Sequence, residues 1–134
     1  MASLTQVEGI GDIYAQKLQE AGIQTTVALL EMGASPAGRK GIAEKTGISE
    51  KLILEWVNHV DLFRIKGVGE EYADLLEEAG VDTVPELAQR NADNLYEKLL
   101  AVNQEKNLVR RLPSQAAVSD WIEQARRLPR IITY

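Results

Sequence analysis

Cysteine is absent from this 134-residue chain, and histidine occurs once, as His59. The absence of cysteine excludes disulfides and thiolate metal sites, and it is typical of proteins in a reducing compartment. With one histidine, at the end of a predicted helix, the sequence gives no basis for a histidine metal cluster or a Ser-His-Asp triad. We therefore expect no catalytic residue, no metal and no cofactor, and we predict that the protein is not an enzyme.

Aromatic residues make up only 5% of the chain, so the core must consist mainly of Leu, Ile, Val and Ala. No apolar run approaches the length that crosses a bilayer, so we expect no membrane association. The first residues, "MASLTQVEGIG", lack the basic and apolar regions of a signal peptide. The sequence predicts a cytoplasmic protein.

Charge is distributed unevenly along the chain. The net charge is −5, yet the residues from Lys98 to the end include seven basic and three acidic side chains. The first 97 residues are therefore strongly acidic. An acidic surface disfavours binding of a polyanion over a wide face, whereas the basic C-terminal part would permit local contact.

Two stretches repeat one pattern: "VEGIGDIYAQKLQEAGIQT" near the start and "IKGVGEEYADLLEEAGVDT" near the middle. Aligning Gly9 with Gly67 gives an offset of 58 residues. Further along, the offset becomes 65 and pairs Trp56 with Trp121. The second copy therefore carries a seven-residue insertion, which we place within "LLAVNQEKNLVRRLP". We expect both tryptophans to serve the core, since they occupy equivalent positions.

The repeat predicts a first copy at residues 1–62, a second at 63–128 and a tail at 129–134. Stacked repeat arrays usually need three or more units, so two copies are expected to close on each other as one compact domain.

The local signals within each copy are helical. Glycine follows the helix after each G-x-G turn, where it would terminate that helix. Thr83, Pro85 and Glu86 predict a capping box at the next helix start in the second copy. Further helices are expected at about residues 37–45, from Ser49, and over "SQAAVSDWIEQARRL". No segment alternates apolar and polar residues over strand length, so the fold class is all-α.

The segments "GIGDIYAQKLQEAGI" and "GVGEEYADLLEEAGV" resemble helix-hairpin-helix motifs, in which a G-h-G turn (h, apolar) joins two short helices. The "TGIS…W" continuation resembles the second hairpin of the double form. Over residues 5–128 the spacing is most similar to an uncharacterised bacterial family of tandem helix-hairpin-helix proteins, a domain of unknown function.

The resemblance implies contact with the sugar-phosphate backbone of DNA, without base readout. The G-x-G turn permits close approach, and the helix after it presents unpaired N–H groups. The residues that the resemblance and the basic C-terminal part assign to this contact are Gly9, Ile10, Gly11, Lys66, Gly67, Val68, Gly69, Arg110, Arg111, Arg126, Arg127 and Arg130.

The chain departs from the DNA-gripping pattern in the charges beside each turn. Glu8 and Asp12 flank the first turn, while Glu70 and Glu71 follow the second. Only Lys66 makes the second turn favourable for an anion. Two hypotheses remain: a non-catalytic, sequence-independent nucleic-acid binder, and a protein-interaction or assembly module that binds no nucleic acid. The sequence also leaves homo-oligomerisation open.

Two smaller features carry expectations. Arg39 and Lys40 form a basic pair that could attract an anion. The tail "RLPRIITY" leaves the helical pattern at Pro129 and is apolar at Ile131, Ile132 and Tyr134. We expect this tail to pack back onto the protein or, as the less favoured alternative, to bind another chain.

Overall fold

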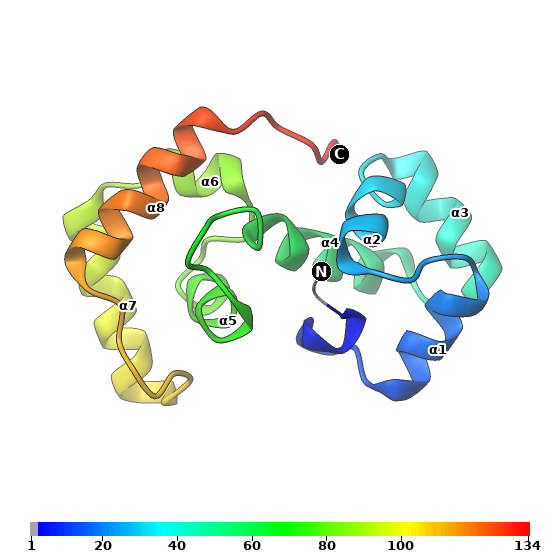
Figure 1. Cartoon of the computed structure of the whole chain (residues 1–134), viewed down its shortest axis with the longest axis horizontal. Helices are drawn as coiled ribbons and strands as arrows, with labels where there is room; N and C mark the ends of the chain where they lie inside the picture. Colours follow the sequence, from blue (N-terminus) through cyan, green and yellow to red (C-terminus); the bar gives the residue numbers. More distant parts are fainter. Residues whose placement is uncertain (1–2) are drawn as a thin grey trace. The chain divides into compact units, whose positions relative to one another are not determined.

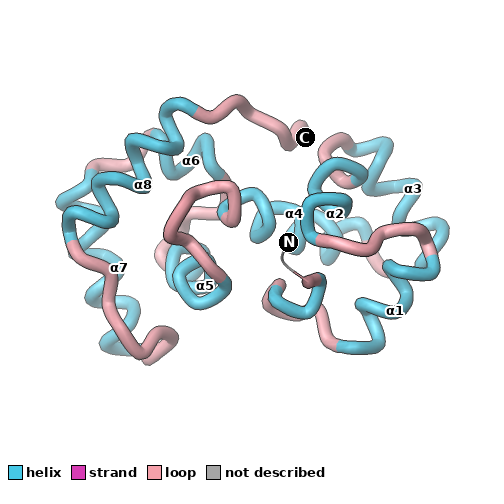
Figure 2. Tube along the Cα trace, viewed as in Figure 1, coloured by secondary structure: helices cyan, strands magenta, loops and turns pink. Residues whose placement is uncertain are grey.

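The computed structural model describes residues 3–134. Within this range the chain forms one 3₁₀-helix and eight α-helices, with no strand, so the all-α class is confirmed (Figures 1 and 2). None of the described helices is both long and apolar enough to cross a membrane. The elements are η1 (Leu4–Gln6), α1 (Asp12–Glu20), α2 (Thr26–Met32), α3 (Pro36–Thr46), α4 (Glu50–Leu62), α5 (Glu70–Glu78), α6 (Val84–Ala88), α7 (Ala92–Lys106) and α8 (Gln115–Arg127).

The residues group into two compact units. Unit 1 comprises residues 1–61 and 131–134, and unit 2 comprises residues 62–130. The boundary falls at the last residue of α4. In unit 2, α8 lies against both α6 and α7 (Figure 1).

Polar side chains cap most of the helix starts. Thr25, Ser35, Ser49, Asn91 and Ser114 each accept a hydrogen bond from the backbone N–H three residues on. Such caps satisfy N–H groups that have no partner within the helix. Short helices such as these depend on caps and on packing because they are marginal in isolation.

The capping box predicted at Thr83 does not form. Thr83 is the N-cap residue of α6, but its side chain accepts no cap hydrogen bond. Its hydroxyl instead donates to Glu86 Oε1 at 3.4 Å, and the Asp82 N–H donates to Glu86 Oε2 at 3.3 Å. Glu86 thus draws the Thr83 hydroxyl away from the backbone N–H that it would cap.

The backbone hydrogen bonds recur at the 58-residue spacing seen in the sequence. Ile10 N–H donates to Val7 O at 3.0 Å, and Val68 N–H donates to Ile65 O at 3.1 Å. After the following helix, Gly22 and Gly80 both have positive φ, of 91° and 92°. The two copies therefore share the geometry of the turn and of the helix end.

Both tryptophans are buried, as predicted for a core role. Trp56 is 1% exposed and Trp121 is 3% exposed. Each contacts the tyrosine of its own copy, with centroid distances of 5.1 Å for Tyr14–Trp56 and 5.2 Å for Tyr72–Trp121. These tilted ring pairs contribute beyond the area that they bury.

The C-terminal tail packs against unit 1, which confirms the favoured expectation. Ile132 is buried, and Thr133 N–H donates to Ala34 O at 2.8 Å. Arg39 is 5% exposed and donates to the carbonyl oxygens of Gly33, Ala34 and Thr133 at 2.9, 3.1 and 2.8 Å. The anion patch expected at Arg39 and Lys40 is therefore wrong for Arg39, because its guanidinium is buried among carbonyl groups.

Candidate nucleic-acid interface

The second glycine turn, residues 67–69, places its two glycines in different environments. Gly67 has a φ of 96°, in the left-handed region that favours glycine. A Cβ atom at Gly67 would lie 3.1 Å from Trp121 Nε1. Both the backbone conformation and the buried tryptophan therefore require glycine at this position.

Gly69 is not required in the same way. It is the exposed N-cap residue of α5, with extended backbone angles of φ −99° and ψ −163°, and it has no side chain with which to cap the helix. A Cβ atom at Gly69 would meet no protein atom within 4 Å. The space above the first turn of α5 is therefore open at this residue.

Val68, between these glycines, points into the core and is 5% exposed. Ile10, its counterpart in the first turn, is 3% exposed. These two residues, which the sequence placed in the interface, can therefore offer only backbone atoms there.

Gln124 of α8 holds the backbone of Lys66 on both sides. Lys66 N–H donates to Gln124 Oε1 at 2.8 Å, and Gln124 Nε2 donates to Lys66 O at 3.1 Å. The same amide nitrogen donates to Asp120 Oδ2 at 2.9 Å. The clamp fixes the approach to the turn and leaves the Lys66 side chain exposed, but it also brings a carboxylate close to that lysine.

The loop before α8 lies beside the start of α5. The hydroxyl of Tyr72, in the first turn of α5, donates to the carbonyl oxygen of Arg111 at 2.9 Å. Arg110 and Arg111 are both exposed. This contact brings the backbone of the two arginines to the helix that follows the second glycine turn.

The other three predicted arginines are not brought to the turn by any observed contact. Arg126 forms an ion pair with Glu123 at 2.6 Å and also donates to Ala88 O at 3.4 Å. Arg127 and Arg130 are exposed near the end of α8. The sequence grouped these arginines by charge alone, which carries no information on the face of the helix that each one occupies.

The first glycine turn, residues 9–11, has the same backbone but different neighbours. Gly9 has a φ of 93°, and a Cβ atom there would lie 3.1 Å from Trp56 Nε1. Gly11 is as open as Gly69. Asp12 and the 73%-exposed Ile13 follow it, so this turn offers an acidic and apolar surface.

Sequence reasoning missed the Gln124 clamp and the contact between Tyr72 and Arg111. Both join residues far apart in the chain and depend on the packing of α8 against unit 2. The repeat gave a partial signal for Tyr72, since Tyr14 occupies the same position in the first copy.

The fold and the two glycine turns define an all-α protein built from a repeated short-helix unit. A family model described as a domain of unknown function, DUF4332, matches residues 8–128, and the chain belongs to this family. Searches of the curated proteins and of the solved structures gave no match.

Proposed function

We propose that the two glycine turns are helix-hairpin-helix turns and that the protein is a non-catalytic, sequence-independent nucleic-acid binder. Its interface would be the second glycine turn together with Lys66, Arg110 and Arg111. A phosphate oxygen would accept hydrogen bonds from the first-turn N–H groups of α5, as anions do at other helix N-termini.

The observation that carries this proposal is the open space at Gly69. Glycine is an ordinary N-cap residue, only a few tenths of a kcal/mol less favourable than Ser, Asp or Asn, and it also lets another group approach the backbone closely. Neither strain nor packing requires glycine here, since the backbone is extended and no protein atom lies near the missing Cβ. Close approach of an external group would account for it.

The charges around the turn predict weak binding. Lys66, Arg110 and Arg111 are exposed and would release counterions on binding. Glu70 and Glu71 in the first turn of α5 would oppose a phosphate, because carboxylates there already interact favourably with the helix dipole. We expect micromolar or weaker affinity for duplex DNA that falls steeply with salt.

Fluorescence anisotropy of a labelled duplex at low salt tests the proposal. Gly69→Ala should reduce binding with little change in thermal stability, because the methyl group would enter open space and the reduced entropy of the unfolded chain offsets the poorer capping by alanine. Lys66→Ala should weaken binding and lower the slope of log K against log salt by about one. Lys51→Ala, at an exposed lysine of α4, is the matched control and should change neither.

A flat anisotropy signal at low salt with up to ~100 µM protein would sink the nucleic-acid hypothesis, because non-specific complexes are tighter than this even at physiological salt. The alternative, a protein-interaction module, would then be favoured. One observation supports it at the first turn: Ile13 is 73% exposed beside Asp12, whereas the second copy has Glu71 at that position.

A further inference from the structure

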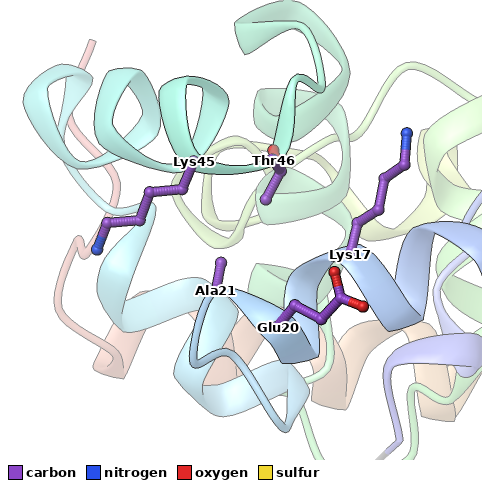
Figure 3. Close-up of a pocket in the computed structure, with 5 residues that line it drawn as sticks. All are labelled: Lys17, Glu20, Ala21, Lys45 and Thr46. Atoms are coloured by element: carbon purple, nitrogen blue, oxygen red, sulfur yellow. The ribbon is translucent and has the colours of Figure 1, made fainter.

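Unit 1 contains a groove between α1 and α3. A hollow of about 590 Å³ is lined by Lys17, Glu20, Ala21, Lys45 and Thr46 (Figure 3). A second hollow of about 270 Å³ shares Ala21 and Lys45 with the first. It extends the groove over an apolar floor that includes Ile23, Met32, Gly41 and Ile42.

The equivalent place in unit 2 carries different side chains. At the 58-residue offset, Lys17 corresponds to Leu75, which is fully buried. Glu20, the last residue of α1, corresponds to Glu78, the last residue of α5. Glu78 forms an ion pair of 2.7 Å with Lys106, the last residue of α7.

The difference arises from the helices that cover α1 and α5. The covering helix has 15 residues in unit 2, α7, but 11 in unit 1, α3. The extra length lies where the sequence places its insertion. The covering helix α7 buries Leu95 and Leu99, whereas α3 buries Arg39 and Ile42 and has Gly41 at the groove. Unit 1 thus lacks the additional helical turn of unit 2 and has a small residue at the groove.

The charges at the groove are opposite in sign to those of the unit as a whole. Residues 1–61 contain eight acidic side chains against four lysines and one arginine, whereas the charged side chains that line the groove are two lysines, Lys17 and Lys45, and one carboxylate, Glu20. Figure 3 shows the two lysine side chains pointing away from each other. This separation suits an elongated occupant better than a small anion, which would need converging cations.

Gly41 lies inside α3, where glycine is unfavourable relative to alanine. A Cβ atom there would meet no protein atom within 4 Å, so packing within the protein does not require glycine. Met32, on the same floor, is 41% exposed. An external backbone that approaches α3 closely would account for both features.

We propose that this groove binds an acidic amphipathic helix of a partner protein. The apolar face of that helix would cover Met32 and Gly41, and its carboxylates would reach Lys17 and Lys45. It would extend in trans the cover that α3 gives to α1, where α7 is longer in unit 2. The site lies in unit 1 and does not depend on the second glycine turn.

The test uses the full chain and a display library of helical peptides of about four turns. Peptides enriched on the wild-type chain are then measured on Gly41→Leu, whose side chain would fill the floor of the groove. We expect at least a tenfold loss of affinity, together with an excess of Asp and Glu in the enriched set. Lys45→Glu should also weaken binding.

Two matched variants control for general effects. Ala101→Leu adds the same side chain at an exposed position of α7, and Lys51→Glu reverses an exposed lysine of α4; both should bind as the wild type does. Circular dichroism melting shows whether each variant is folded, and Gly41→Leu should remain so, because it replaces glycine inside a helix. The proposal is overturned if no peptide is enriched, or if enriched peptides bind Gly41→Leu as tightly as the wild type.

Discussion

Two glycines in the same helix should respond in opposite ways to alanine. Gly38 and Gly41 both lie in α3, so alanine at either position should gain about 0.5–1 kcal/mol from helix propensity. At Gly41 nothing opposes this gain, because the new methyl group would enter open space. Gly41→Ala should therefore raise the free energy of unfolding by about that amount.

At Gly38 the new methyl group would meet the end of α2. Its Cβ would lie 2.1 Å from Met32 O and 3.3 Å from Ser35 Oγ, the hydroxyl that caps α3. Relief requires α3 to shift away from α2, and overpacking of this kind typically costs about 1–3 kcal/mol. When the gain in helix propensity is subtracted from this cost, Gly38→Ala should lower the free energy of unfolding by about 1 kcal/mol.

The two variants should thus differ by about 2 kcal/mol, which corresponds to about 6 °C in Tm for a chain of this length. Urea unfolding followed by circular dichroism, alongside thermal melts, measures both quantities. Equal stability of Gly38→Ala and Gly41→Ala would refute the close approach of α3 to Met32. A loss of stability in Gly41→Ala would refute the open floor of the groove.

Three further predictions concern other parts of the fold. Gly67→Ala should destabilise the protein by about 1 kcal/mol or more, because of its positive φ, whereas the melting curve of Gly69→Ala should match the wild type. Arg39→Ala should lower the free energy of unfolding by about 2 kcal/mol, because it removes three hydrogen bonds to carbonyl groups. Since one of these bonds holds Thr133, the variant should also be digested faster by a carboxypeptidase at the tail. Burial raises the pKa of Asp82 above its ordinary value of 3.8, and the nearby carboxylates of Glu86 and Glu77 add to the shift. The ionised form of Asp82 therefore destabilises the folded state at pH 7, so Asp82→Asn should raise the Tm there. This gain should vanish as the pH falls below 3.8, where Asp82 is protonated in both the folded and the unfolded chain.

The sequence predicts the all-α class and the glycine turns well because both depend on local signals. Residues that occupy equivalent positions in the repeat, such as Trp56 and Trp121, are also assigned correctly to the core. Apolar periodicity, glycine at helix ends and capping side chains act over a few residues and can be read directly. The capping box at Thr83 fails because the Glu86 carboxylate accepts from the Thr83 hydroxyl and from the Asp82 N–H, which a pattern of residue types does not show.

The candidate site was predictable only in part. The backbone of the second turn follows from its glycines, but the placement of Arg111 depends on the hydroxyl of Tyr72, 39 residues away in the sequence. The burial of Arg39 depends on the carbonyl groups of Gly33 and Ala34 and on that of Thr133 in the tail, and the sequence does not indicate that the guanidinium meets them. The groove between α1 and α3 was not predicted. It arises from a shorter covering helix and a small residue, Gly41, and both become apparent only when the packing of the two copies is compared.

That comparison suggests that the two copies have diverged in their binding roles. The second copy seals its helix interface with Leu75 and retains Lys66 beside its open turn, whereas the first has an acidic turn and leaves its groove open. If each copy has its own ligand, the two activities should be separable. Lys66→Ala should weaken duplex binding and leave peptide binding unchanged, while Lys45→Glu should do the reverse in the same two assays. A variant at either lysine that weakens both activities equally, with an unchanged melting temperature, would contradict two separate sites and indicate one shared surface.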